Sequence, residues 1–145
     1  MAKTPPFYPQ ETDFSCAVAC LRMVLRALGV PKTEAELRDL CDCTIFGTSA
    51  LELVLAARRL GFAASSKHTL RLPDLIELTE NGYFPIVYVV STPHVPTPDV
   101  HSFVVVSATR DRIDVLDPEQ GPRAIGIDDF LERWSPMNNL TIVIA

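Results

Sequence analysis

This sequence of 145 residues has little positive charge, few cysteines and no long apolar run. Its 13 Lys and Arg residues are outnumbered by 18 Asp and Glu residues, which gives a net charge of −5. Because the sequence has no basic stripe that could neutralise phosphates, we expect no nucleic-acid partner. The chain is 48% hydrophobic, which excludes intrinsic disorder and allows a sizeable core.

Apolar runs are short throughout, and none approaches the roughly 18 residues that a membrane-spanning helix needs. The opening residues 1–6 also lack the apolar core of a signal peptide. We therefore expect no integral membrane segment. Four cysteines are too few for a disulfide scaffold in a chain of this length, which favours a cytoplasmic location where thiols stay reduced.

The chain length fits a single domain over residues 1–145, and no repeat or long linker divides it. Prolines are plentiful: they predict an extended arm over the first ten residues and a stiff, irregular loop over 91–99. An irregular loop of that length in a compact domain is often functional.

Helical patterns fill the first half and strand patterns the second. The apolar spacing predicts helices over residues 16–28, 33–41, 49–60 and 73–82, two of which open with capping boxes. Runs rich in Val, Ile and aromatic residues predict strands over 84–90, 102–108, 112–117 and 140–145, with a hairpin turn at 109–112 and a last helix over 128–134. This order predicts an α+β fold, in which an N-terminal helical layer packs on a C-terminal antiparallel β-sheet.

Cys16 is the strongest candidate for chemistry among the four cysteines. It follows the polar, non-helical stretch 10–15 and stands in the first turn of the first predicted helix. Unpaired backbone N–H groups and the helix dipole favour an anion there, so they would stabilise a thiolate. The alternative interpretation is a small apolar residue at a helix start.

The other three cysteines have simpler explanations. Cys20 lies one helical turn further on, beside the apolar stripe, and is expected to be a buried structural thiol. Cys41 and Cys43 form a Cys-x-Cys pair, but no further Cys or His pair follows at a recognised metal-ligand spacing. We therefore expect no metal ion and no cofactor.

His101 is the best placed of the three histidines to act as a general base. His68 and His94 are most simply solvated surface residues. His101 closes the proline-rich loop and opens the most apolar predicted strand, so it joins a rigid scaffold to an exposed edge.

Asp117 ends the partner strand and is a candidate to orient His101, because a hairpin brings both residues to one end of the strand pair. A two-residue turn at 110–111 would place Asp117 opposite Val104, whereas a turn nearer Thr109 would place it opposite His101. The sequence leaves this register open. The alternative interpretation of Asp117 is a turn-forming strand terminator.

Gln10 is the fourth candidate, because its amide donates a hydrogen bond without changing charge, as an oxyanion stabiliser must. It lies six positions before Cys16, far enough for an irregular arm to double back over the helix start. The alternative interpretation is a surface amide.

Three stretches carrying these candidates resemble the papain-like leader peptidase family. Residues 10–23 look like the opening of that family, which includes the N-terminal peptidase domains of bacteriocin-exporting ABC transporters that cut after a double glycine. Residues 101–106 and 115–121 resemble its His and Asp-Pro motifs, and residues 130–134 resemble its closing helix. The resemblance covers nearly the whole chain and implies a papain-like cysteine peptidase fold.

By this resemblance, Cys16 is the nucleophile, His101 the base and then the acid, and Asp117 the residue that orients His101. Gln10 is the oxyanion donor, together with the Cys16 backbone N–H. The sequence departs from the family in two ways: Ala17 stands where Gly usually follows the Cys, and neither a membrane span nor an ATPase motif is present. The substrate therefore cannot be taken from transporter-linked members.

Two classes of function remain open. The first is a cysteine peptidase that cleaves a peptide or leader sequence, although the same four residues could serve an amidase or acyltransferase. The second is a catalytically silent domain that holds a leader peptide in its cleft. Both hypotheses predict a peptide or protein partner. Whether the chain associates with an exporter or with another chain stays open.

Overall fold

The computed structural model describes residues 4–145 of the chain. Residues 4–10 of the predicted arm contain neither helix nor strand, and residues 1–3 of it lie outside the described part. The helices are α1 (Cys16–Ala27), α2 (Glu34–Leu40), α3 (Ala50–Arg59), α4 (Leu72–Glu80) and α5 (Ile127–Trp134), followed by a short 3₁₀ helix (Ser135–Met137). The strands are β1 (Ser66–Thr69), β2 (Ile86–Val90), β3 (Val100–Ala108), β4 (Arg112–Asp117), β5 (Gly121–Gly126) and β6 (Leu140–Val143).

Both predicted capping boxes form, which explains where α2 and α3 begin. Thr33 and Glu36 exchange side-chain to backbone hydrogen bonds at the start of α2, and Ser49 and Glu52 do the same at the start of α3. These bonds satisfy N–H groups that the first turn of a helix leaves without partners. The predicted helices are therefore confirmed, with ends shifted by a few residues.

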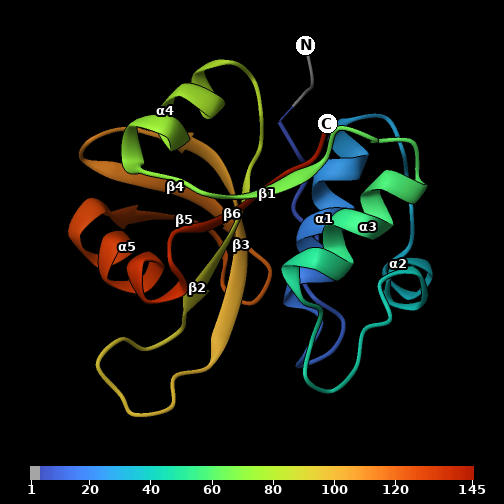
Figure 1. The fold of residues 1–145 in the computed structure, drawn as a ribbon, viewed down its shortest axis with the longest axis horizontal. Coiled ribbons are helices and arrows are strands. Elements are labelled where there is room, and N and C mark those ends of the chain that lie inside the picture. The colour runs from blue at the N-terminus through green and yellow to red at the C-terminus, as the bar shows by residue number, and fades with distance from the viewer. Residues whose placement is uncertain (1–3) are drawn as a thin grey trace.

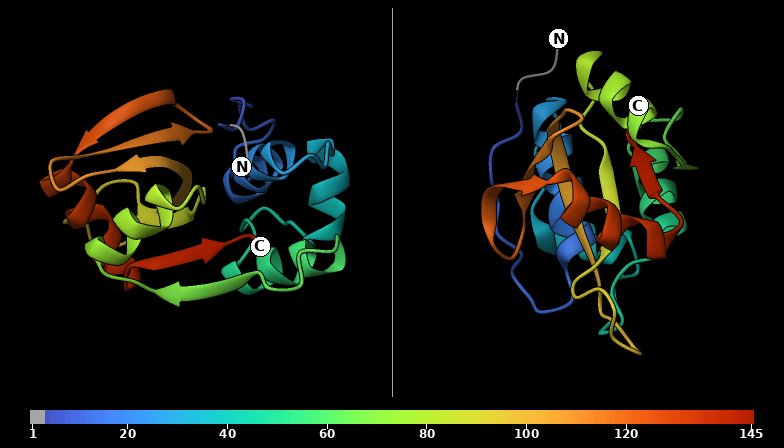
Figure 2. Two further views of the ribbon diagram at one scale, coloured as in Figure 1. Left: turned by 90° about the horizontal axis from the view of Figure 1, so that it is seen from above. Right: turned by 90° about the vertical axis from the view of Figure 1, so that its left-hand side faces the viewer.

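The six strands form one antiparallel sheet in the order β1-β6-β2-β3-β4-β5. Helices α1, α2 and α3 lie on one side of the molecule, and the sheet with α4 and α5 lies on the other (Figure 1). The view from above shows the same separation (Figure 2). The α+β class and the packing of an N-terminal helical layer on the sheet are confirmed.

Helices cover both faces of the sheet, an arrangement that the two-layer prediction did not include. One hydrophobic cluster joins α1 and α3 to the sheet through Ile86, Val104 and Ile142. A second cluster packs Phe130 and Trp134 of α5, with Leu75 of α4, against the opposite face. Because successive side chains of a strand point to opposite faces, the fully buried strand β2 contributes to both clusters.

The sequence analysis did not predict two of the strands. β1 is a short edge strand with mostly exposed side chains, and β5 opens with Gly121-Pro122 at the other edge. Neither carries the run of β-branched or aromatic residues on which the prediction relied, and proline is tolerated at edges because no ladder N–H is needed there. Within residues 4–145, no helix is long and apolar enough to cross a membrane.

Candidate active site

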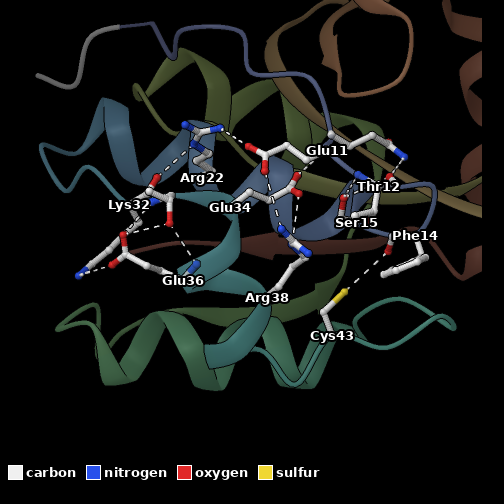
Figure 3. Close-up of polar contacts among 12 residues, drawn as sticks. Glu11, Thr12, Phe14, Ser15, Arg22, Lys32, Glu34, Glu36, Arg38 and Cys43 are labelled. Atoms are coloured by element: carbon white, nitrogen blue, oxygen red, sulfur yellow. Dashed lines mark hydrogen bonds and ion pairs between the residues drawn. The ribbon is translucent and has the colours of Figure 1, made fainter.

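Cys16 stands at the start of α1 and is partly exposed. Ser15 precedes it as the N-cap residue, yet its side chain makes no capping bond. The Ser15 hydroxyl instead donates to the Thr12 carbonyl at 3.2 Å and accepts the Thr12 N–H at 3.1 Å (Figure 3). The N–H groups in the first turn of α1 are thus left for a ligand, and the helix dipole favours negative charge there.

His101 and Asp117 form a close, buried polar pair in the site. The His101 Nε2 atom lies 2.7 Å from Asp117 Oδ1, and both side chains are buried, with relative exposures of 11% and 1%. Asp117 Oδ1 also accepts the backbone N–H groups of Glu119 at 2.9 Å and Gln120 at 3.3 Å. The carboxylate is therefore fixed by the turn that follows β4, and it holds the imidazole in turn.

A β-bulge in β3 places these two residues on the same face of the sheet. The hairpin turn is the short one, since the Thr109 N–H donates to the Arg112 carbonyl. Ser107 pairs with Asp114, but the register shifts before Val105, so that Val104 pairs with Leu116 rather than with Asp117. Without the shift, Asp117 would oppose Val104 and point to the other face from His101. Neither register considered from the sequence is therefore the one observed.

The protonation of the pair follows from this geometry. Burial raises the pKa of Asp117, but its bonds to His101, Glu119 and Gln120 outweigh burial and lower it. Burial lowers the pKa of His101, but hydrogen bonds to Asp117 and to the Cys16 side chain, with their charges, raise it from 6.5 to about 9. With a pKa of about 9, His101 is an imidazolium at neutral pH, hydrogen-bonded to the Asp117 carboxylate and close enough to Cys16 for that side chain to raise its pKa.

The ring orientation assigns a separate partner to each nitrogen of His101. Because Nε2 bonds to Asp117, Nδ1 is the nitrogen left for the Cys16 side chain. The Cys16 Sγ atom also lies 4.0 Å from the buried Ser102 hydroxyl, the residue after His101 on β3. The Cys16 thiol of α1, the His101 imidazole of β3 and the Asp117 carboxylate of β4 thus lie next to one another in this order.

Gln10 borders the same cleft, on the arm that leads to α1. Its Nε2 atom donates to the Thr12 carbonyl at 2.8 Å. An amide nitrogen carries two hydrogens, so this bond leaves one of them for a ligand. The structure therefore brings all four predicted site residues to one cleft, with the Gln10 side chain folded onto its own loop.

The cleft has a volume of about 1190 Å³, larger than a typical small-molecule pocket. Besides the four residues above, Tyr88, Arg123 and Arg133 line it. Ile45 and Phe46 stand at its rim with 72% and 93% of their surface exposed. Ala17 borders the cleft as well, but it is only 3% exposed and packs in the core, so its methyl group presents little surface to a ligand.

The remaining cysteines and histidines do not line the cleft. Cys20 is fully buried, which raises its pKa well above the ordinary value, and burial raises the pKa of Cys41 to about 12. Cys43 points toward the Phe14 carbonyl at 3.8 Å. The exposed His68 bonds to the Ser66 hydroxyl, and the exposed His94 lies 3.6 Å from Glu132 on α5. In the described part of the chain, no three His, Cys, Asp or Glu side chains gather as a metal site would require.

Arg123 is a site residue that the sequence did not indicate. Its Nη2 atom lies 3.1 Å from Asp117 Oδ2, an ion pair without the alignment of a hydrogen bond. Arg123 belongs to β5, one of the two missed strands, so nothing in the sequence predicted its approach to Asp117. Ser102 was also missed, although a polar residue inside an apolar strand next to the candidate base was an available signal.

A thiol at a helix start, facing an imidazole and a carboxylate on an antiparallel sheet, is the arrangement of a papain-like fold. The chain belongs to the peptidase C39 family, whose family model matches residues 5–144. This membership agrees with the resemblance found in the sequence.

Among curated proteins, the chain is 33% identical over 133 residues to the transport/processing ATP-binding protein ComA of Streptococcus pneumoniae. That match covers 89% of this chain but 17% of ComA, so the chain spans only about a sixth of the length of this relative. The solved peptidase domain of Streptococcus ComA superposes with a TM-score of 0.80 at 25% identity and covers 97% of this chain and 96% of that domain.

A second solved structure is a double glycine motif protease from an AMS/PCAT transporter in complex with its leader peptide. It superposes with a TM-score of 0.75 at 20% identity, covering 99% of this chain and 94% of the other. At that identity the likeness establishes the shared fold.

Proposed function

We propose that this chain is a cysteine peptidase domain that cleaves a peptide substrate, with a double-glycine leader peptide as the favoured class. The observation that carries the proposal is that Cys16, His101 and Asp117 line one cleft, in which the His101 ring is bonded to the Asp117 carboxylate. The sequence alone left the substrate open, and membership of the peptidase C39 family together with the leader-bound neighbour supports this substrate class. The large cleft and its apolar rim suit an extended peptide.

In the first half of the proposed reaction, the Cys16 thiolate attacks the carbonyl carbon of the scissile bond. The π electron pair of the C=O bond then moves onto the carbonyl oxygen. The Cys16 backbone N–H and the free hydrogen of the Gln10 amide stabilise that oxyanion. When the intermediate collapses, the C–N bond breaks and the His101 imidazolium gives its proton to the leaving amine. A thioester on Cys16 remains.

In the second half, neutral His101 takes a proton from a water molecule, whose oxygen attacks the thioester carbon. The C–S bond then breaks, so that a carboxylic acid leaves and the thiolate–imidazolium pair is restored. Asp117 keeps Nδ1 of His101 directed toward Cys16 and stabilises the imidazolium in both halves. The bond to His101 and the backbone N–H groups of Glu119 and Gln120, which lower the pKa of Asp117, keep it ionised.

All four cysteines are free, which supports a reducing compartment such as the cytoplasm for this domain. The covalent intermediate formed on Cys16 is common to peptidases, amidases and acyltransferases, so substrate choice rather than the triad separates these activities.

The proposal is tested with a leader-type peptide whose Gly-Gly carboxyl end is joined to a fluorogenic amine. We expect the wild-type chain to release the amine, whereas Cys16→Ala and His101→Ala reduce release to background. Iodoacetamide at about pH 6 is expected to label Cys16 far faster than Cys20, Cys41 or Cys43. Release by either variant would contradict the mechanism, and loss of activity on chelation would point to a metal instead.

Peptide binding without release, together with slow labelling of Cys16, would instead identify a silent leader-binding domain. Cys20→Ala serves as the control variant, because it removes a thiol from the same helix without touching the proposed site. It is expected to retain full activity.

A further inference from the structure

Glu34 is a buried carboxylate that the proposed mechanism does not use. It is the first residue of α2, and its side chain is 0% exposed. Its Oε1 atom accepts the backbone N–H of Glu11 at 3.0 Å, which joins α2 to the arm that carries Gln10 (Figure 3). Burying a carboxylate is expensive unless hydrogen bonds or charges compensate it, so this contact requires an explanation.

The side chain of Glu11 is held from the same side. Arg22 of α1 lies 3.4 Å from its carboxylate, and Arg38 of α2 lies 3.8 Å from it (Figure 3). Arg38 also approaches Glu34 Oε2 at 3.4 Å, as an ion pair without hydrogen-bond alignment. These four charged residues fix one point of the arm to the two helices.

The residue before Glu11 is fixed to the opposite half of the molecule. The backbone N–H of Gln10 donates to the Pro118 carbonyl at 2.9 Å, next to Asp117 at the end of β4. Gln10 is thus tied to the sheet, while Glu11 is tied to the helices. The arm bridges the two sides of the cleft, and the Gln10 amide lies at the crossing point.

The charge of Glu34 is only partly compensated. Burial raises the pKa of Glu34 above its ordinary value, while the Glu11 N–H, the Ser15 hydroxyl and Arg38 act in the opposite direction. Its direct hydrogen bond goes to the arm rather than to its own helix, and α2 already has a complete capping box from Thr33 and Glu36. The i,i+4 ion pair of Glu34 with Arg38 also supports α2, but the stability of that helix alone does not explain the bond from Glu34 to the arm.

We infer that Glu34 is a positioning residue for the oxyanion-binding arm, an inference that rests on the proposed function. By accepting the Glu11 N–H, it fixes the arm so that the Gln10 amide and the Cys16 N–H face the same point of the cleft. Its loss frees the Glu11 N–H to seek water, which displaces Gln10. A displacement of about 1 Å in such a group can reduce turnover by about 100-fold.

The test replaces Glu34 by Met, which fills a similar buried volume but accepts no strong hydrogen bond. Removing one partner of a buried ion pair destabilises a protein when the other charge is left buried and unpaired, but Arg38 is partly exposed and also pairs with Glu11, so E34M is expected to fold. We expect kcat for the Gly-Gly fluorogenic peptide to fall by about 10- to 100-fold. Alkylation of Cys16 by iodoacetamide builds no oxyanion, so its rate is expected to stay within about twofold of wild type.

Two further variants separate positioning from folding. E34Q retains an oxygen that accepts the Glu11 N–H, and it is expected to restore kcat to within about threefold of wild type. E36A removes the capping box of the same helix and lowers the melting temperature, but it does not touch the arm and is expected to leave kcat unchanged.

Wild-type kcat in E34M would overturn the inference, as would an equal loss of turnover and of Cys16 alkylation, which indicates general disruption of the site. An E34Q variant as impaired as E34M would also overturn it, because the accepted hydrogen bond would then not be the cause. A wild-type chain that neither turns over the peptide nor reacts rapidly at Cys16 would contradict the proposed function, a distinct result.

Discussion

The helical half and the sheet half of this molecule hold their site residues in different ways. On the sheet, His101 and Asp117 belong to neighbouring strands, are buried and are joined by a hydrogen bond of 2.7 Å. On the helical side, Cys16 follows an irregular arm whose position depends on exposed ion pairs and single hydrogen bonds. Regular structure thus fixes the proposed base and its orienting carboxylate, whereas irregular chain positions the proposed oxyanion donor.

This difference has a physical reason. Strands paired over several residues resist local displacement, because many ladder bonds and packed side chains must change together. The arm is held instead by isolated bonds to different elements, the Gln10 N–H to Pro118 and the Glu11 N–H to Glu34, so the loss of one bond can displace it. Substitutions in only one half of the molecule can therefore separate the two contributions.

The largest effect is expected from Asp117→Asn on the sheet side. The amide removes the charge that stabilises the imidazolium and no longer enforces the ring orientation, so we expect kcat/KM to fall by about 10²- to 10⁴-fold. The pKa of His101, about 9 in the wild-type chain, is expected to fall because Asp117 is a main cause of its elevation. The alkaline limb of the kcat/KM profile then moves to lower pH.

A D117N variant with an unchanged alkaline limb would show that the limb reports another group. Asp114→Asn is the matched control, because it lies on the same strand and bonds to Ser107 rather than to His101. The D114N variant is expected to have the same pH profile of kcat/KM as the wild-type chain.

A smaller effect is expected from Gln10→Ala on the helical side. Loss of one oxyanion donor reduces kcat by about 10²- to 10³-fold in other enzymes, and the Cys16 backbone N–H remains here. Alkylation of Cys16 is expected to be unchanged, which distinguishes Q10A from D117N. Equal losses of turnover and of alkylation in Q10A would mean that the arm supports the nucleophile rather than the oxyanion.

The smallest effect concerns stability rather than turnover. The pKa of His101 is raised from 6.5 to about 9 in the folded chain, so the folded state holds this proton more tightly than the unfolded state. The resulting stabilisation is complete below about pH 6.5 and is lost as the pH rises through about 9, with an upper bound of about 3 kcal/mol.

Denaturant unfolding at a series of pH values measures this contribution. His101→Asn is expected to flatten the dependence between about pH 6.5 and 9, because it removes the titrating group. A slope that persists unchanged in H101N would assign the stabilisation to another residue.

The sequence was most informative where local chemistry determines structure. Capping boxes located the starts of α2 and α3, and the polar stretch before Cys16 indicated the start of α1. The shared strand end of His101 and Asp117 also followed from the hairpin turn at 109–112. These features depend on residues within a few positions of one another.

Features set by tertiary contacts could not be predicted in the same way. The residues of β5 have low strand propensity and become a strand only because β4 offers them a free edge. Glu34 resembles any acidic residue in the first turn of a helix, and only the returning arm makes it a buried acceptor. The bulge in β3 is likewise invisible in the run 103–106, where every residue suits a strand.

That bulge limits how the chain can vary in length. Val106 is the residue without a partner between the pairs Val105–Val115 and Ser107–Asp114. Extra residues at the turn would lengthen a loop and leave the site intact, whereas deletion of Val106 would turn Asp117 away from His101 without altering either residue. For Val106, presence in the chain matters more than side-chain identity, so among related sequences we expect substitutions at this position but no gaps.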